Sequence, residues 1–261
     1  MDQPLDDIEF LSRSEHRVKV LDAVAEHPRS RTDLRALTGA SSSTIGRMLG
    51  EFEERYWVER VGHRYEATSL GAFVAEGMLN LLERMETERT LREVWQWLPT
   101  EEIGFDVESF ADAVVTVPEF GSPDRTVSRF AELVEETKTI RGFTTTTVTS
   151  DMEVLFRNAI EGMETELLWP SDLTETVLAS HPEQARKAIE NGDITILIND
   201  GLPCACAIFD DRVGLAGYDR ETGIMRATID TDAPEARRWA EALYESYRRD
   251  ARPLDPEAIV A

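Results

Sequence analysis

Apolar positions in the first third of the chain recur every three or four residues, which is the spacing of amphipathic helices. Three successive helices are predicted, from Ser14 to His27, from about Arg31 to Thr38, and from an N-cap at Ser41 onward. The residues expected to face the core are Val18, Leu21, Val24, Ala25, Leu34, Leu37, Ile45, Met48, Leu49 and Phe52. The short turn between the second and third helices contains Gly39, so this pair has the form of a helix-turn-helix.

The pattern then changes to the alternation that is typical of strands. Residues 57–61 and 64–67 are two short alternating stretches with Gly62 and His63 between them, which predicts a β-hairpin. Three helices followed by a two-stranded wing form a winged helix-turn-helix, which we expect over residues 1–69.

Residues 70–98 carry a broad apolar stripe that predicts one long helix, or two helices broken near Thr87–Thr90. Such a stripe after a winged domain favours a linking helix that packs on its mate in a homodimer. The alternative is a helix of the intramolecular core. A domain boundary is expected at Pro99–Glu102.

Residues 99–261 combine both patterns and predict a mixed α/β domain. Strands are expected at 113–117, 139–148, 166–169, 194–198, 204–209, 213–218 and 224–229, and helices at 126–136, 152–163, 173–190 and 234–249. The alternation of strands and helices from 139 to 198 is that of a parallel sheet, and the later strands are expected to form hairpins. The whole chain is therefore predicted to have two domains, of the α+β and α/β classes.

The charge of the chain is strongly acidic except in one segment. The chain carries 51 acidic residues against 28 basic ones, a formal net charge of -23, and its lysines are Lys19, Lys138 and Lys187. Such an acidic, lysine-poor composition resembles that of proteins from extremely halophilic archaea, so the acidity says little about partners. Residues 29–64 are the exception, with seven arginines against five acids.

The sequence carries no membrane or export signal. No apolar run approaches the roughly 18 residues that a spanning helix needs. The N-terminal stretch MDQPLDDIEF is acidic where a signal peptide would be basic. We therefore expect a cytoplasmic protein with no membrane partner.

The excess of arginine coincides with the predicted helix-turn-helix. The first turn of a recognition helix meets DNA, where small hydroxyl side chains permit close approach to phosphates. Arg47 is long enough to reach guanine edges in the major groove, and the wing tip is placed to touch the adjacent backbone or minor groove. The predicted DNA-binding residues are Arg31, Ser42, Ser43, Thr44, Gly46, Arg47, His63 and Arg64. The alternative is a well-capped helix in an all-α packing module.

Ligands of α/β sheets usually bind at the carboxyl ends of the strands. Two loops are expected there, and their hydroxyls, carboxylates and aromatic wall suit a polar metabolite. The predicted effector-binding residues are Thr145, Thr147, Trp169, Ser171 and Asp172, with Arg141 and Tyr218 at the rim. The alternative is that the threonines form a strand, that Ser171 caps a helix and that Trp169 belongs to the core.

Signatures of catalysis are absent from the sequence. It contains no G-x-G-x-x-G, no G-x-x-x-x-G-K-[ST] and no G-x-S-x-G. The four histidines and two cysteines lack the spacing of zinc ligands. We expect no enzymatic activity, no cofactor and no metal. Cys204 and Cys206 permit a redox-sensor hypothesis, but buried cysteines that fill a tight sheet are more ordinary.

The order of these parts, with the segment ADAVVTVPEFGSPDRTVSRFAELVEETKTIRGFTTT, resembles the archaeal winged-helix regulators related to the methanogenesis and filament-formation regulatory protein. More remotely the chain is similar to the TrmB-type sugar-responsive regulators, which implies a phospholipase-D-like sensor fold. The reactive signature of that superfamily is His-x-Lys. The residues two positions after the four histidines are Val18, Arg29, Tyr65 and Glu183, so the resemblance implies the fold without the catalytic motif.

Together these features predict a transcriptional regulator that binds double-stranded DNA as a homodimer. Residues 99–261 are expected to sense a small-molecule effector, and residues 70–98 to link the two functions. The alternative is a constitutive architectural or interaction protein whose second domain serves only for assembly.

Overall fold

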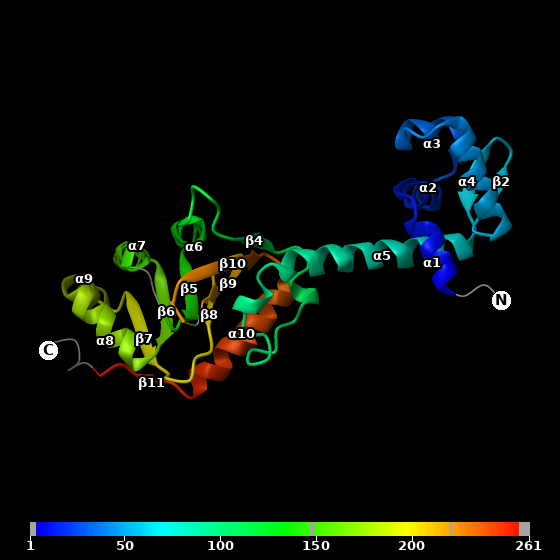
Figure 1. The fold of residues 1–261 in the computed structure, drawn as a ribbon. Coiled ribbons are helices and arrows are strands. Elements are labelled where there is room, and N and C mark those ends of the chain that lie inside the picture. Colours follow the sequence, from blue (N-terminus) through cyan, green and yellow to red (C-terminus); the bar gives the residue numbers. More distant parts are fainter. Residues whose placement is uncertain (1–3, 147–148, 220, 256–261) are drawn as a thin grey trace. The chain divides into compact units, whose positions relative to one another are not determined.

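The computed structural model describes residues 4–146, 149–219 and 221–255. The chain divides into two compact units, Met1–Glu86 and Thr87–Ala261. Both contain helices and a β-sheet, and each has its own hydrophobic core (Figure 1). No helix within the described ranges is long and apolar enough to span a membrane.

The first unit contains the predicted helices and hairpin. Its elements are α1 (Pro4–Ser12), α2 (Glu15–Glu26), β1 (Arg29–Ser30), α3 (Arg31–Thr38), α4 (Ser42–Glu54), β2 (Val58–Val61), β3 (Arg64–Ala67) and the first part of α5 (Ser69–Arg92). The three helices and the β2–β3 hairpin are confirmed. Helix α1 and strand β1 were not predicted, and β1 joins the hairpin to make a sheet of order β1-β3-β2.

Local side-chain bonds set the boundaries of α3 and α4. The Ser30 hydroxyl accepts a hydrogen bond from the Asp33 amide, and the Asp33 carboxylate accepts one from the Ser30 amide, which forms a capping box. Gly39 ends α3 in the left-handed conformation, with φ of 71°. The Ser41 hydroxyl accepts from the Thr44 amide and caps α4, as predicted.

The core of the first unit lies between α1, α2, α4 and the hairpin. Ile45, Met48, Leu49 and Phe52 of α4 are buried, as the helical spacing predicts. The prediction for Leu37 was wrong, because its side chain is 57% exposed. Helix α1 contributes Phe10, whose ring meets Phe52 and Trp57 edge to face.

Helix α5 starts against the hairpin through a glycine. A Cβ added at Gly71 would lie 1.8 Å from the Trp57 carbonyl oxygen, while one added at Gly77 of the same helix would meet nothing within 4 Å. We expect Gly71→Ala to lower the free energy of unfolding by about 1–3 kcal/mol through overpacking. Gly77→Ala should raise it by about 0.5–1 kcal/mol, because alanine is the better helix former. Urea unfolding of both variants tests this pair, and an equal effect of the two substitutions would contradict the contact.

Residues 69–92 form one helix without the predicted break near Thr87–Thr90. The helix ends at Arg92, earlier than the predicted Leu98, and a 3-10 turn follows at Trp95–Trp97. Leu91, Val94 and Leu98 are buried in the second unit. Several other apolar residues of the predicted stripe are exposed: Leu70, Phe73, Leu81, Leu82 and Met85. The stripe is therefore only partly covered within one chain.

The second unit is built on one mixed eight-stranded sheet. Its strands, in the order β11-β7-β6-β5-β8-β9-β10-β4, are β11 (Arg252–Pro253), β7 (Ile194–Ile198), β6 (Glu164–Trp169), β5 (Thr139–Phe143), β8 (Ala205–Ile208), β9 (Val213–Tyr218), β10 (Met225–Thr231) and β4 (Val114–Thr116). The helices are α6 (Arg125–Glu136), α7 (Thr149–Ile160), α8 (Ser171–Ser180), α9 (Pro182–Glu190) and α10 (Pro234–Arg249), with short 3-10 turns η1 (Trp95–Trp97) and η2 (Glu108–Phe110).

Strands β5, β6 and β7 are parallel, as predicted, and the remaining pairings of the sheet are antiparallel. One predicted hairpin is wrong: β8 follows β7 in the chain but pairs with β5. The predicted helix over 173–190 is also wrong, because it is two helices that meet at Pro182. A proline lacks the amide hydrogen that an uninterrupted helix needs at that position. Strand β5 ends at Phe143, earlier than predicted.

Two cores cover the two faces of this sheet. One is formed by α6, α7, α8 and α9 against residues such as Ile140, Leu167 and Trp169. The other is formed by α10 and residues 91–110 against residues such as Phe143, Cys206 and Leu215. Figure 1 shows α7 and α10 on opposite sides of the sheet. The unit is therefore a three-layer α/β arrangement.

Candidate functional site

The N-terminus of α4 presents a group of hydroxyl side chains. Ser42 and Ser43 are exposed and Thr44 is half-buried. The Ser41 hydroxyl lies 2.9 Å from both the Ser43 and the Thr44 hydroxyls. The amides of a first helical turn have no partner inside the helix. The Thr44 amide donates to the Ser41 hydroxyl, so the turn offers its other amides together with small hydroxyls as hydrogen-bond donors to a phosphate.

Arg47 lies one turn further along α4 and is largely exposed. Its Nη1 is 2.8 Å from Glu51 Oε1, and the second oxygen of Glu51 is 3.1 Å from Arg17 Nη2. Arg17 is nearly buried, and its guanidinium lies 4.0 Å from the centre of the Phe10 ring. Glu51 is thus neutralised by Arg17 whether or not Arg47 is bound to it. Since an exposed ion pair contributes at most about 1 kcal/mol, Arg47 can exchange this partner for another acceptor.

Arg31 is held over α4 by the wing. Its Nε donates to the Tyr65 hydroxyl at 3.1 Å, and Tyr65 is buried. A Cβ added at Gly46 would lie 3.8 Å from Arg31 Nη1, which is ordinary contact, so Gly46 lies directly beneath this guanidinium. Tyr65 therefore fixes Arg31, from the start of α3, against the outer face of α4.

Arg60 joins the same group and was not among the predicted residues. It lies opposite Tyr65 in the β2–β3 register, with its guanidinium carbon 5.9 Å from the centre of the Tyr65 ring. Its Nε also donates to the Gly62 carbonyl at 3.0 Å. The predicted hairpin already places Arg60 opposite Tyr65, and residues that face each other across two strands are neighbours. The position of Arg60 beside Tyr65 could therefore have been predicted from the sequence. We call Arg31, Gly46, Arg47, Arg60 and Tyr65 the arginine surface.

The wing tip places His63 and Arg64 differently. Both are exposed, but Arg64 Nη1 donates to the Pro28 carbonyl at 3.2 Å and so ties the wing to the chain before β1. His63 stands at the turn itself. The structure thus brings Arg31, Gly46 and Arg47 together on α3 and α4, with the hydroxyls at the start of α4 and the two wing residues on the same unit.

The predicted effector residues are distributed over several places in the second unit. Trp169 and Tyr218 line one pocket, together with Thr144 and Thr146. Thr145 lines a neighbouring hollow with Trp97, Cys204 and Tyr218. Thr147 lies outside the described residues. Of the predicted effector residues, therefore, only Trp169 and Tyr218 line one pocket together.

The other three predicted residues are held by bonds within the chain. Arg141 lies 3.5 Å from Glu241 and 3.9 Å from Glu245, both on α10. The Ser171 amide and hydroxyl donate to the Asp200 carboxylate at 2.7 and 3.1 Å. Asp172 is exposed and accepts from the Leu173 amide. None of these three lines the pocket of Trp169 and Tyr218.

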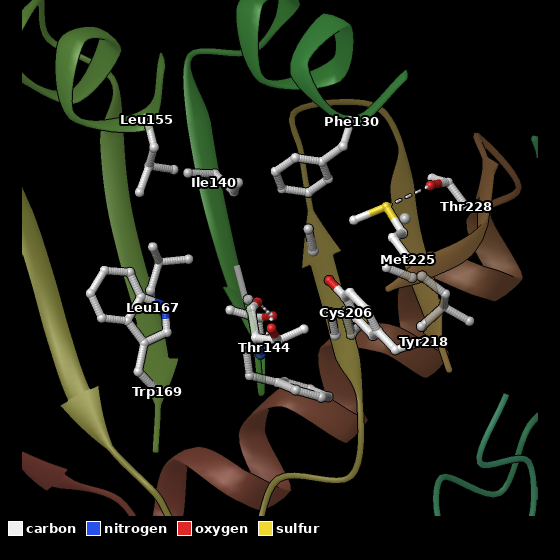
Figure 2. A pocket seen from close by; sticks show the side chains of 18 of the residues that line it. Phe130, Ile140, Thr144, Leu155, Leu167, Trp169, Cys206, Tyr218, Met225 and Thr228 are labelled. Atoms are coloured by element: carbon white, nitrogen blue, oxygen red, sulfur yellow. Dashed lines mark hydrogen bonds between the residues drawn. The ribbon is translucent and has the colours of Figure 1, made fainter. Parts of the chain in front are cut away.

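That pocket lies at the carboxyl ends of β5 and β6, beneath α6 and α7. It leaves a cavity of about 50 Å³. Figure 2 shows its wall, in which the labelled apolar side chains are Phe130, Ile140, Leu155, Leu167, Trp169 and Met225. No charged side chain is among the described lining residues. The lining of this pocket is thus mostly apolar, whereas the polar groups of Arg141, Ser171 and Asp172 bond to the chain elsewhere.

Cys204 and Cys206 are buried in the core on the α10 side of the sheet. Burial raises the pKa of the Cys204 thiol to about 12 and raises the pKa of the Cys206 thiol well above its usual range. The thiolate is the reactive form of cysteine. We therefore expect iodoacetamide at pH 8 to leave both thiols of the folded chain unmodified and to label both after unfolding in urea. Mass spectrometry checks this, and stoichiometric labelling of the folded chain would favour the redox-sensor hypothesis instead.

Among the described residues, no group of three or more histidine, cysteine, aspartate or glutamate side chains is arranged to hold a metal ion.

Two family models match the chain. The middle domain of the methanogenesis regulatory protein FilR1 matches residues 123–250, and the HVO_A0261 N-terminal domain matches residues 5–90. Each model falls within one of the two compact units, apart from the last residues of the second match. A search of curated proteins finds no match.

Three solved structures give a general likeness. TrmBL2, described as an archaeal chromatin protein with a novel mode of DNA binding, is 13% identical, with 97% of this chain and 100% of that chain covered and a TM-score of 0.45. The phospholipase D family member Nuc from Salmonella typhimurium is 13% identical, with 54% and 98% covered and a TM-score of 0.41. NucT from Helicobacter pylori is 12% identical, with the same coverage and a TM-score of 0.43. Scores this low do not identify a function.

Proposed function

Because the chain belongs to the archaeal regulators that carry the FilR1 middle domain, we propose that it is a sequence-specific, DNA-binding transcriptional regulator. The first unit is the DNA-binding part, a winged helix-turn-helix over residues 1–69 with α4 as the recognition helix. Residues 70–98 link it to an effector-sensing part, residues 99–261. The matched family is a regulatory one, which favours a role without catalysis.

The observation that carries this proposal is the arginine surface. In a chain with a net charge of -23, Arg31, Arg47 and Arg60 are exposed, and Arg47 lies one turn beyond the hydroxyl-rich start of α4. Tyr65 holds two of them in place through a hydrogen bond and a ring contact. Phosphate contacts fix the register of such a unit on DNA, and a long donor such as Arg47 reads base edges.

The exposed side of α5 supports a dimer. Leu70, Phe73, Leu81, Leu82 and Met85 are between 41% and 75% exposed on one helix. An exposed apolar stripe of this length is expected to be covered by a partner. Two copies joined here would present two α4 helices to two half-sites, and a ligand in the second unit would change their spacing.

Capture of genomic DNA fragments by the full chain in molar KCl tests the proposal, with Arg47→Ala as the comparison. The expected result is enrichment of a few promoter fragments that the variant loses. Equal capture of all fragments, or the same enrichment with both proteins, would contradict sequence-specific binding through α4. The first of these outcomes would favour the alternative of an architectural or interaction protein.

A further inference from the structure

The pocket under α6 and α7 contains a buried donor without an acceptor. Trp169 is 0% exposed, and its indole Nε1 has no hydrogen-bond partner among the described residues. An indole nitrogen only donates, and leaving a buried donor unpaired costs about 1–3 kcal/mol. Figure 2 shows the indole nitrogen on the side of the ring that faces Thr144 across the pocket.

Two other polar groups that line the pocket already bond to the chain. Thr144 Oγ1 donates to the Thr146 carbonyl and accepts from the Thr146 amide. Thr228 Oγ1, on β10, donates to the Thr126 carbonyl at 3.3 Å. These threonines line the pocket with their hydroxyl hydrogens engaged, and Tyr218 also lines it. The indole N–H of Trp169 differs from these groups in being a buried donor without an acceptor among the described residues.

The rest of the lining sets the character of a ligand. Phe130, Ile140, Leu155, Leu167 and Met225 are apolar. Transfer of a charged group into such surroundings without a partner is strongly unfavourable. Small residues on the floor, among them Gly214 and Ala216 of β9, leave the space that large side chains would fill.

We propose that this pocket binds a small, uncharged and mostly apolar molecule that carries one hydrogen-bond acceptor, such as a carbonyl oxygen, which accepts from Trp169 Nε1. The cavity of about 50 Å³ limits the buried part to a few non-hydrogen atoms. This inference rests on the sensing role proposed for the second unit and names the chemical class of its effector. It replaces the polar metabolite that the sequence favours.

The test uses the full chain without DNA and two probes of matched shape, cyclopentanone and cyclopentane. The five tryptophans give five indole N–H signals in a ¹H–¹⁵N spectrum, and Trp169→Phe identifies the signal of Trp169. We expect cyclopentanone to move this signal downfield in a saturable way. Cyclopentane should bind at least about tenfold more weakly, because it leaves the buried donor unpaired.

Two variants make the result specific to the pocket. Ala216→Val fills the cavity from the sheet side and should abolish the response to cyclopentanone. Trp95→Phe, at a partly exposed tryptophan outside the lining, should leave the response unchanged. An unmoved Trp169 signal, equal affinity for both probes, or undiminished binding by Ala216→Val would each overturn the inference. DNA capture is measured separately, so a chain that captures promoters but fails these tests refutes only the ligand class.

Discussion

Asp230→Asn is expected to be among the most destabilising single substitutions in the second unit. Asp230 is fully buried on β10, and its carboxylate receives Arg129 Nε and Nη2 at 2.9 and 2.8 Å. Arg212 Nε donates to the same carboxylate at 2.8 Å. The pKa of Arg129 is raised, first of all by its hydrogen bonds to Asp230. The carboxylate therefore joins α6 to the loop before β9.

Removing this charge leaves two guanidinium groups, each about three-quarters buried, facing a neutral amide. Loss of one partner of a buried ion pair costs about 3–5 kcal/mol, and the partial exposure of both arginines places the expected loss near the lower end. Urea unfolding of the full chain measures it. The control is Asp232→Asn, since Asp232 is largely exposed and 3.9 Å from Arg212. A loss no larger than that of the control would contradict this account of the Arg129–Asp230–Arg212 group.

Arg47→Ala is expected to weaken binding to the operator by about 1–3 kcal/mol, or roughly 5-fold to 150-fold, if Arg47 reads a base edge. Its ion pair with Glu51 is exposed and does not oppose this strongly. Arg47→Lys keeps the charge but loses the planar fork, so it should restore little of the lost discrimination. The measurement is an equilibrium titration of operator DNA in molar KCl.

The matched control for Arg47 is Arg186→Ala, which removes the same charge from an exposed position of α9 in the other unit. It should leave operator affinity unchanged. An equal loss on operator and on unrelated DNA for Arg47→Ala would assign Arg47 to phosphate contact alone. No loss on either DNA would remove Arg47 from the interface.

Local patterns predicted the first unit well because its boundaries depend on neighbouring residues. The Ser30 and Ser41 caps and the Gly39 turn are each visible within four residues of sequence. Leu37 fits the helical spacing and is nevertheless exposed, since the eight-residue helix α3 buries only Leu34. Helix α1 escaped prediction because it has a single buried residue, Leu11.

The second unit was harder to predict because its topology depends on distant pairings. The alternation of strands and helices indicates the parallel set, but nothing near β8 reveals that it pairs with β5. The same reason separates the predicted effector residues. Trp169 lines the pocket because it ends a parallel strand. Ser171 instead bonds to Asp200, which lies 29 residues away in sequence.

The most direct test of the central claim is the ratio of affinities of the full chain for a captured promoter fragment and for a scrambled fragment of equal length and composition. The titrations are made in molar KCl, where contacts to phosphate alone are weakened. Sequence-specific regulators bind their sites about 10³-fold or more tightly than other DNA, and we predict a ratio of at least that size. Equal affinity for the two fragments would contradict a sequence-specific regulator.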